Sequence, residues 1–408
     1  MTGADSGSGG TDDVLLARAY LSRVAEPASG AVWRFVRDVG PAAAAAAIRE
    51  SRAPDDVRSA TEARRDEADP HDDIESAARH GIRLVIPESD EWPHFALGSL
   101  ERAGERVYVA GTSGGRRADV GDPVPPLALW VRGNGELASL GVASIGIVGA
   151  RASTAYGDHV TADIAYGLAR RGVVVVSGGA YGIDAAAHRA ALAGAGQTVI
   201  VSAGGIDRPY PAGNSTLFAR ATEAGLVLSE SPPGTTPQRH RFLRRNRLIA
   251  ALSAGVVVVE AGHRSGAANT AGHGFLLGRP VMAVPGPITS PMSAGCHALL
   301  RRVPEPAVLV TSVDDILEAT SIALSAGTAS AHAATTPAEA RRDTLDGLDP
   351  VARRVFEGLS ARTFARPESI AVRSGVPVLE VLRALPALEL FALVDISDDG
   401  YRAAAAPR

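Results

Sequence analysis

Lysine is absent from this chain of 408 residues, and all 41 basic residues are arginines. A Schiff-base lysine, a lysine general base and a phosphate-binding loop of the G-x-x-x-x-G-K-[ST] type are therefore excluded. Cysteine is nearly absent too, because Cys296 stands alone. One cysteine excludes an internal disulfide and a multi-cysteine zinc site. It also favours a reducing compartment, so we expect a cytoplasmic protein.

Long apolar runs are also missing. No stretch approaches the roughly 18 apolar residues of a membrane span, and the N-terminal letters MTGADSGSGGTDD hold no apolar segment typical of a signal peptide. His263, His273 and His297 lack metal-ligand spacing. We therefore expect no membrane association, no metal and no cofactor.

The order of patterns along the chain predicts several domains. Residues 1–13 are rich in glycine, serine and acids and are expected to be disordered, whereas 14–80 hold helix-like segments between proline and glycine breaks and predict a helical, SAM-like domain. A central domain is expected over 81–321, followed by an Ala/Ser/Thr-rich linker over 322–343.

The C-terminal residues 344–408 show the pattern helix, helix, turn, helix and two short strands, which predicts a winged helix. Its expected recognition helix, 377–388, carries Arg383 as its one basic residue. Helices that grip DNA are normally richer in positive charge, so this pattern favours a protein-facing or structural role.

Seven short runs rich in β-branched residues alternate with helix-length segments in the central domain; they are 144–149, 173–178, 198–203, 226–230, 256–260, 281–286 and 307–311. Continuous apolar strands are buried on both faces, and helix-length crossovers between them imply a parallel sheet. We expect an α/β fold with a doubly wound parallel sheet and helices on both sides.

Glycine-rich turns follow several of these predicted strands, including the turns at Gly178 and Gly179 and at Ser265 and Gly266. Ligands of an open parallel sheet bind outside the carboxyl ends of its strands. Glycine lets the backbone approach a ligand closely, and helix N-termini add a positive dipole end. This edge of the sheet therefore suits phosphate.

Five arginines crowd into nine residues of a chain whose formal net charge is -4; they are Arg239, Arg241, Arg244, Arg245 and Arg247. Arginines in the first turn of a helix oppose its macrodipole and repel one another, which favours an anion nearby. Phe242 offers a face on which a base can stack, so charge and stacking occur together as in single-strand binding. The alternative is an arginine face paired with Asp and Glu, with Phe242 in the core.

Asp184 and His188 lie four residues apart in the string GIDAAAH. Two side chains at this spacing share one face of a helix, so an acid–base dyad is one interpretation. The favoured interpretation is a structural hydrogen bond that holds the preceding glycine loop.

Nine motifs, in order, resemble the DNA-processing protein A family, also called DprA or Smf; they are IPESDEWPHFAL, LWVRG, IVGARASTAYG, VVSGGAYGIDAAAH, TVIVSAGGIDRPYPAGN, LSESPPGT, FLRRNRLIAALS, VVEAGHRSGAANTA and VMAVPGPITSPMSAGCHALL. The resemblance implies an extended Rossmann-like core between an N-terminal helical domain and a C-terminal winged helix. It also implies a homodimer that binds single-stranded DNA without catalysis or sequence preference and hands it to the recombinase RecA in natural transformation.

Carried over by motif, the resemblance implies a phosphate pocket lined by Arg151, Gly178, Gly179, Phe242, Arg244, Asn246, Arg247, Ser265 and Gly266. The other arginines of the cluster, Arg239, Arg241 and Arg245, are expected beside them. The chain departs from the family pattern at Tyr181, where some members have a basic residue, and at Cys296 and His297, where many have Thr and Asn.

Two other functions stay open. Rossmann-like enzymes that cleave nucleoside monophosphates at the base–sugar bond share a glycine-rich crevice. The chain, however, reads EAGHRSGAANTAG over 260–272, where those enzymes have P-G-G-x-G-T-x-x-E. A winged-helix regulator of duplex DNA is the other alternative, and the poorly charged recognition helix argues against it.

Overall fold

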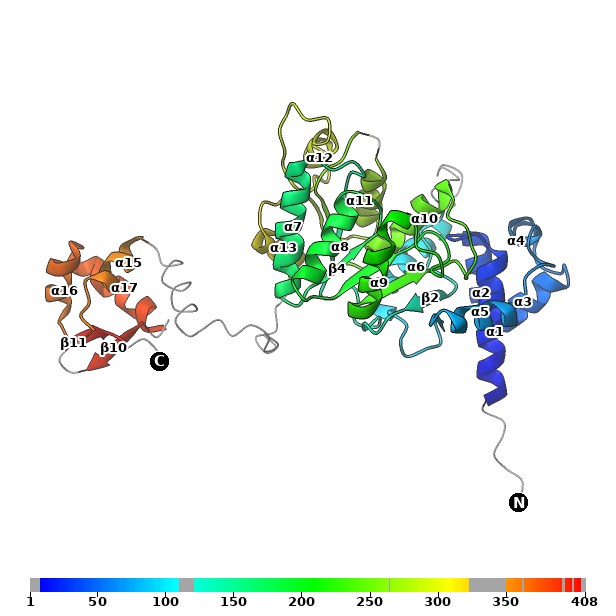
Figure 1. Cartoon of the computed structure of the whole chain (residues 1–408), viewed down its shortest axis with the longest axis horizontal. Coiled ribbons are helices and arrows are strands. Elements are labelled where there is room, and N and C mark those ends of the chain that lie inside the picture. Colours follow the sequence, from blue (N-terminus) through cyan, green and yellow to red (C-terminus); the bar gives the residue numbers. More distant parts are fainter. Residues whose placement is uncertain are drawn as a thin grey trace, which may run out of the picture. The chain divides into compact units, whose positions relative to one another are not determined.

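The computed structural model describes residues 8–109, 121–263, 265–322, 350–361, 363–390, 393–397 and 400–404. The chain divides into two compact units, Met1–Thr328 and Ala329–Arg408 (Figure 1). In the described parts of the chain, no helix combines the length and the apolarity that crossing a membrane requires.

Five helices occupy the segment for which helices were expected; they are α1 (Ser8–Val24), α2 (Gly30–Val39), α3 (Pro41–Arg49), α4 (Asp55–Thr61) and α5 (Pro70–Arg79). Figure 1 shows them gathered at one end of the first unit. The core shared by α1 to α4 includes Tyr20, Leu21, Val32 and Ile48, whereas Ala77 of α5 packs in a separate cluster with Trp130. Apolar residues at helical spacing thus bury one stripe of each helix, as the pattern predicts.

Helix α1 begins at Ser8, within the segment that was expected to be disordered. Its C-terminal half is anchored by Tyr20 and Leu21 in the core. Once such a nucleus exists, each further residue adds one backbone hydrogen bond, so a helix propagates into polar sequence. Residues 1–7 lie outside the described residues.

The central sheet has nine strands; they are β1 (Arg83–Val85), β2 (Leu129–Arg132), β3 (Ser144–Val148), β4 (Val174–Ser177), β5 (Thr198–Val201), β6 (Leu226–Ser229), β7 (Gly255–Val258), β8 (Val281–Ala283) and β9 (Val308–Leu309). Their order is β1-β2-β6-β5-β4-β3-β7-β8-β9. The seven predicted strands are β3 to β9, and all of them pair in parallel, which confirms the prediction.

Strands β1 and β2 extend the sheet by antiparallel pairing. The sequence did not predict them, because both lie before residue 144, outside the alternation of apolar runs and helix-length segments that marks the other strands. Trp130 of β2 is fully buried, so the second strand adds core as well as length to the sheet.

Alternate residues of the parallel strands enter different cores, which makes the sheet doubly wound. Ile145 and Ile147 pack on one side with α7 (Ala155–Arg170), α8 (Ile183–Ala193) and α13 (Val313–Thr320). Val148 and Val258 pack on the other side with α6 (His94–Val109), α10 (Arg239–Ala251) and α11 (Gly266–Leu276). Successive side chains of a strand point to opposite faces, so continuous apolar runs are needed here.

Two further helices and a short turn complete this unit; they are α9 (Ser215–Ala224), α12 (Ala294–Leu300) and the 3-10 helix η2 (Ala212–Asn214). The strand order reverses at β3, because β4, β5 and β6 follow on one side and β7, β8 and β9 on the other. In open α/β sheets, ligands bind at such a switch point, outside the carboxyl ends of the strands.

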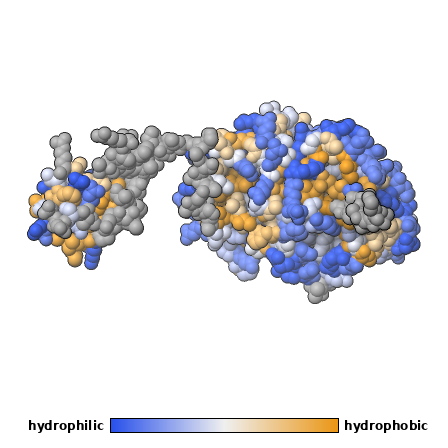
Figure 2. All heavy atoms as spheres, turned by 90° about the horizontal axis from the view of Figure 1, so that it is seen from below, coloured by the Kyte–Doolittle hydropathy of each residue, from blue (hydrophilic) through white to orange (hydrophobic). Residues whose placement is uncertain are grey.

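The C-terminal unit contains α15 (Pro350–Glu357), α16 (Pro367–Ser374), α17 (Val378–Leu390) and an antiparallel hairpin of β10 (Val394–Ser397) and β11 (Gly400–Ala403). This order of elements is the one expected over 344–408, and its assignment as a winged helix stays a prediction. Val372, Leu379 and Leu382 are exposed, and Figure 2 shows hydrophobic residues on the visible surface of this unit. Apart from Ile322, the expected linker over 322–343 lies outside the described residues.

Candidate nucleic-acid interface

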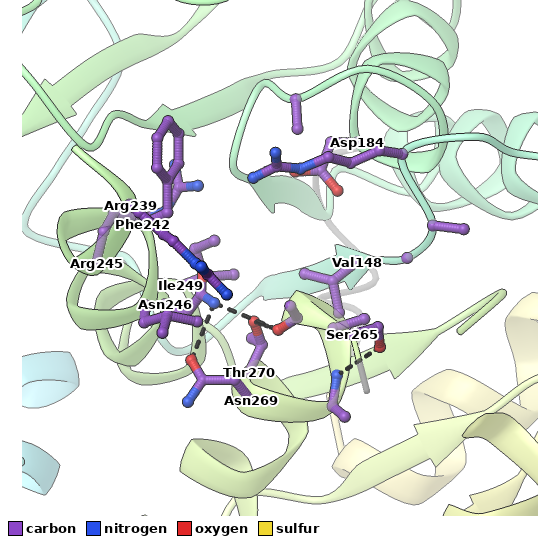
Figure 3. Close-up of a pocket in the computed structure, with 18 of the residues that line it drawn as sticks. Val148, Asp184, Arg239, Phe242, Arg245, Asn246, Ile249, Ser265, Asn269 and Thr270 are labelled. Atoms are coloured by element: carbon purple, nitrogen blue, oxygen red, sulfur yellow. Dashed lines mark hydrogen bonds between the residues drawn. The ribbon is translucent and has the colours of Figure 1, made fainter. Parts of the chain in front are cut away.

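A cavity of about 1090 Å³ opens at the switch point of the sheet (Figure 3). Its walls come from segments far apart in the sequence. Val148 ends β3 and Arg151 follows it, Ala180 follows β4, and α10 and the first turns of α11 supply most of the rest. The cavity therefore lies where the parallel topology predicts a ligand site.

Positive charge and aromatic rings converge in this cavity. Arg151, Arg239 and Arg245 line it together with Phe242 and Tyr210. The guanidinium carbon of Arg151 lies 5.3 Å from the centre of the Phe242 ring, and that of Arg245 lies 5.9 Å from it. The Tyr210 and Phe242 rings are 5.6 Å apart at 50°. Such distances are typical of cation–π and tilted aromatic contacts.

Helix α10 presents one face to the cavity. Arg239, Phe242, Asn246 and Ile249 recur at intervals of three and four residues, which places them on one side of a helix, and Figure 3 shows them along the same wall. The Asn246 side-chain amide donates to the Asn269 side chain at 3.0 Å and to the Gly266 carbonyl at 3.3 Å. This contact fixes α10 against α11 at the cavity.

Arg245 lines the cavity and also ties α10 to the turn after β4. It is buried and donates to the Gly178 carbonyl at 3.0 Å and to the Val201 carbonyl. A Cβ atom at position 178 would lie 2.6 Å from the Arg245 guanidinium and 2.8 Å from the Asp184 carboxylate, so only glycine fits there. Gly179 has φ +69°, a left-handed conformation that glycine adopts without strain. The two glycines thus shape the turn behind the cavity and are not part of its lining.

The predicted structural role of Asp184 is confirmed. Its carboxylate accepts a hydrogen bond from the Gly178 amide at 3.2 Å and so holds the glycine turn. His188 pairs instead with the Thr198 hydroxyl at 2.6 Å. Burial raises the pKa of Asp184 and lowers that of His188 to about 3, so His188 is neutral at pH 7. Burial also lowers the pKa of Arg245, to about 10, which leaves it positively charged.

Arg241 and Arg244 face away from the cavity. Both turn to Glu26, in the connection between α1 and α2, where Arg241 makes two contacts at 2.6 and 3.0 Å and Arg244 one at 3.5 Å. His240 lies 3.0 Å from the same carboxylate. Burial would raise the pKa of Glu26, but hydrogen bonds from Arg241 and His240 prevail and lower it to about 2.

Arg247 is fully buried and pairs with Glu230 through two contacts of 2.8 and 2.6 Å. Arg241, Arg244 and Arg247, which were expected at the phosphate pocket, are therefore placed elsewhere by the structure. A helix turns by about 100° per residue, so five arginines in nine residues spread around its circumference. The crowded arginines predicted an anion nearby. For these three arginines, that anion is a carboxylate of the same chain, Glu26 or Glu230.

The structure brings together Arg151, Arg239, Phe242, Arg245, Asn246, Ser265 and Gly266 of the expected set. Sequence reasoning missed Tyr210 and Asn269. Tyr210 lies in the string GGIDRPYPAGN after β5, so a search for aromatic residues beyond the strand ends would have found it. Asn269 gives no such signal, because an asparagine within a helix is common and only its contact with Asn246 distinguishes it.

Comparison with known proteins decides the family. Residues 118–321 match the model of the DNA recombination-mediator protein A family. A Mycobacterium tuberculosis protein that carries the name DNA processing protein DprA is 46% identical over 393 residues, which cover 96% of this chain and 95% of that protein. The chain belongs to the DNA-processing protein A family. The resemblance seen in its motifs is thereby confirmed.

Other DprA proteins match the central part of the chain. DNA processing protein DprA of Bacillus subtilis is 40% identical over 194 residues, 48% of this chain and 64% of that protein. The X-ray structure of DprA from Streptococcus pneumoniae is similar with a TM-score of 0.58 and 29% identity, and the match covers 75% of this chain and 97% of that one. This likeness and the parallel sheet confirm the extended Rossmann-like fold.

The described residues contain no group of three or more His, Cys, Asp or Glu side chains that could hold a metal ion. Cys296, the single cysteine, is buried with its sulfur 3.5 Å from the Val259 carbonyl oxygen. Burial raises the pKa of its thiol to about 11, so it is not a thiolate at neutral pH.

Proposed function

We propose that this member of the DprA family binds single-stranded DNA, without sequence preference and without catalysis, in the cavity at the switch point. The observation that carries the proposal is the convergence of three guanidinium groups, from Arg151, Arg239 and Arg245, with the rings of Phe242 and Tyr210. Guanidinium groups bind phosphate, and aromatic rings stack on bases. Because every base has a π-face, stacking tolerates any sequence.

This arrangement favours single strands over duplex. Phe242 is half-buried at the cavity wall and reaches a base only if that base has left its own stack. In a duplex, bases are paired and stacked, so binding here would require unstacking that costs a few kcal/mol. Positive charge alone would bind both forms of DNA, and the aromatic pair adds the selectivity.

The binding test is fluorescence anisotropy of a labelled dT oligonucleotide and of a matched duplex over a salt series. The Arg239→Ala variant removes a cavity charge, so we expect weaker binding and a log–log salt slope that is smaller by about 0.7 for each phosphate that the variant no longer neutralises. The control is Arg58→Ala, which removes an exposed arginine of α4 paired with Asp55. Equal affinity for duplex and single strand would refute the proposal.

The absence of catalysis is supported by the cavity's chemistry. Among its described lining residues Asp184 is the only carboxylate, and its oxygens are engaged by backbone amides of the glycine turn. A base–sugar hydrolase needs a carboxylate or similar group directed at its substrate. Incubation with nucleoside monophosphates should release no free base. Measurable release would support the enzyme alternative instead.

Family membership supports the wider proposal that the protein acts in the cytoplasm as a homodimer and hands single-stranded DNA to the recombinase RecA. Light scattering coupled to size exclusion should give twice the chain mass of 41.9 kDa. The protein should also shorten the lag before RecA assembles on labelled single strands, and Arg239→Ala should shorten it less. A monomer would refute the proposed homodimer. A lag that the wild-type protein leaves unchanged would refute the proposed delivery of DNA to RecA.

A further inference from the structure

Resting on the function proposed above, we propose that Tyr181 and Tyr210 form a second base-binding subsite, on the rim of the cavity, where bases that leave the cavity stack. The occupant is the same single strand, continued beyond the cavity. Three features support this subsite. Both rings are exposed, hydrogen bonds join the loops that carry them, and the Tyr210 ring contacts Phe242 in the cavity.

Tyr210 connects the cavity to its surroundings. Its ring contacts Phe242 inside the cavity at 5.6 Å, yet 51% of the residue is exposed. One side of the tyrosine thus belongs to the cavity wall, and the other faces outward. A base that stacks on this outward side would follow directly after one that contacts Phe242.

Tyr181 lies in the turn after β4, next to Ala180, which lines the cavity. It too is 51% exposed. A Cβ atom on Gly213 would lie 2.5 Å from the Tyr181 hydroxyl oxygen, so the phenol packs over the backbone of the loop that carries Tyr210. The absence of a side chain at position 213 makes room for this contact.

The two loops are also joined by hydrogen bonds. The Asn214 side-chain amide donates to the carbonyls of Gly179 and Ala180, at 3.0 and 3.3 Å. Because the turn with Tyr181 and the loop with Tyr210 are fixed to each other, both rings are held in place before a ligand arrives. Tyrosine has few rotatable bonds, so stacking on it costs little conformational entropy.

The charge beside these rings suits nucleic acid. The Arg208 side chain, two residues before Tyr210, is 88% exposed. The Arg208 guanidinium lies 3.7 Å from the carboxylate of its neighbour Asp207, but that carboxylate faces inward: the Asp207 side chain is 8% exposed and accepts a hydrogen bond from the Gly234 amide at 2.9 Å. The loop thus exposes a cation beside an aromatic ring. In proteins that bind single strands, positive charge contacts the phosphate backbone and aromatic rings stack on the bases.

The experiment compares two dT oligonucleotides, of about 4 and about 16 nucleotides, which span the site sizes of single-strand binding folds. The short strand fills the cavity, whereas the long one also reaches the rim. We expect Tyr181→Ala and Tyr210→Ala each to weaken binding of the long strand about 10-fold, the loss of one stacked base. For Tyr181→Ala, affinity for the short strand stays within twofold of wild type.

Three controls define the mechanism. Tyr181→Phe keeps the ring and should bind like wild type. Tyr166→Ala removes a tyrosine of similar exposure, 47%, from α7 and should not change binding of either strand. The salt slope of Tyr181→Ala should equal that of wild type, because a stacking contact releases no counterion.

The outcomes separate the two proposals. Phe242→Ala should weaken both oligonucleotides, since its ring lies inside the cavity. If it does so while Tyr181→Ala binds the long strand as wild type does, the rim subsite is refuted and the cavity proposal stands. A smaller salt slope in Tyr181→Ala would refute stacking as well, because it indicates a phosphate contact. If wild type binds neither strand, both proposals fall.

Discussion

A buried carboxylate, Glu230, and a half-buried one, Glu26, explain most of the unexpected arginine positions. Glu230 pairs with the fully buried Arg247, and Glu26 contacts Arg241, Arg244 and His240. A guanidinium group without a partner is costly inside a protein, and its removal from a buried pair leaves the other charge unpaired. These residues therefore determine folding stability first and DNA binding second.

Arg247→Ala should lower the free energy of unfolding by about 3–5 kcal/mol, because it leaves Glu230 buried without its partner. Urea denaturation followed by circular dichroism measures this loss. Arg58→Ala, which breaks an exposed pair, should cost less than about 1 kcal/mol. If Arg247→Ala is as stable as wild type but fails to bind DNA, the arginine acts on the ligand and the interpretation is wrong.

Acid should weaken the fold through Glu26. The pKa of its carboxyl falls from 4.5 to about 2 on folding, so its stabilisation is complete above pH 4.5 and disappears as the pH falls towards 2. Because Glu26 is only partly buried, solvent screening holds this contribution below about 3 kcal/mol. Unfolding free energies measured across this range should therefore drop more steeply for wild type than for Glu26→Gln. Parallel profiles would show that Glu26 does not carry this pH dependence.

Helix α10 and the glycine turn are the elements that shape the cavity. One face of α10 lines it through Arg239, Phe242 and Asn246, and the opposite side is held by Glu26. The turn after β4 accepts a hydrogen bond from Arg245 through its Gly178 carbonyl. Displacement of either element would move the charges and the ring together.

Two glycine substitutions test whether the turn after β4 needs glycine, with a glycine of α11 as the control. Gly178→Ala places a methyl group within 3 Å of Arg245 and Asp184, so we expect a loss of about 1–3 kcal/mol in stability and weaker DNA binding. Gly272→Ala lies in α11 with open space around it, and it should raise stability by up to about 1 kcal/mol. Thermal unfolding and anisotropy test both variants. Wild-type behaviour of Gly178→Ala would show that the turn adapts.

On the scale of the molecule, the N-terminal helices and the sheet form one compact unit. Arg23 of α1 donates to the Pro233 carbonyl at 2.8 Å and to the Thr235 hydroxyl at 3.3 Å, in the segment that leads into α10. Glu26 then holds α10 itself. Partly buried polar contacts thus join the segments on the two sides of the boundary that was expected near residue 80.

A chain that ends at Thr328 should therefore keep wild-type affinity for a dT oligonucleotide, because the cavity and its supports lie within the first unit. A chain that lacks residues 1–80 should be less stable and bind more weakly, since α10 loses Arg23 and Glu26. Anisotropy and thermal unfolding of the two shortened proteins test this. Loss of binding in the first, or full binding in the second, would contradict it.

The sequence by itself determined the parallel sheet and the family, and it predicted a candidate site outside the carboxyl ends of the strands. Those features depend on local patterns: β-branched runs such as 256–260 form buried strands, and motifs identify relatives without a structure. The role of Asp184 could be predicted as well, because its partner lies only six residues away.

Only the tertiary structure decided which arginines face the ligand. The sequence places all five on one short helix, but Glu26 and Glu230 draw Arg241, Arg244 and Arg247 to other sides of it. Those carboxylates are between 17 and 218 residues away along the chain. No local pattern encodes such contacts, because they arise only when folding brings the segments after α1 and after β6 to α10.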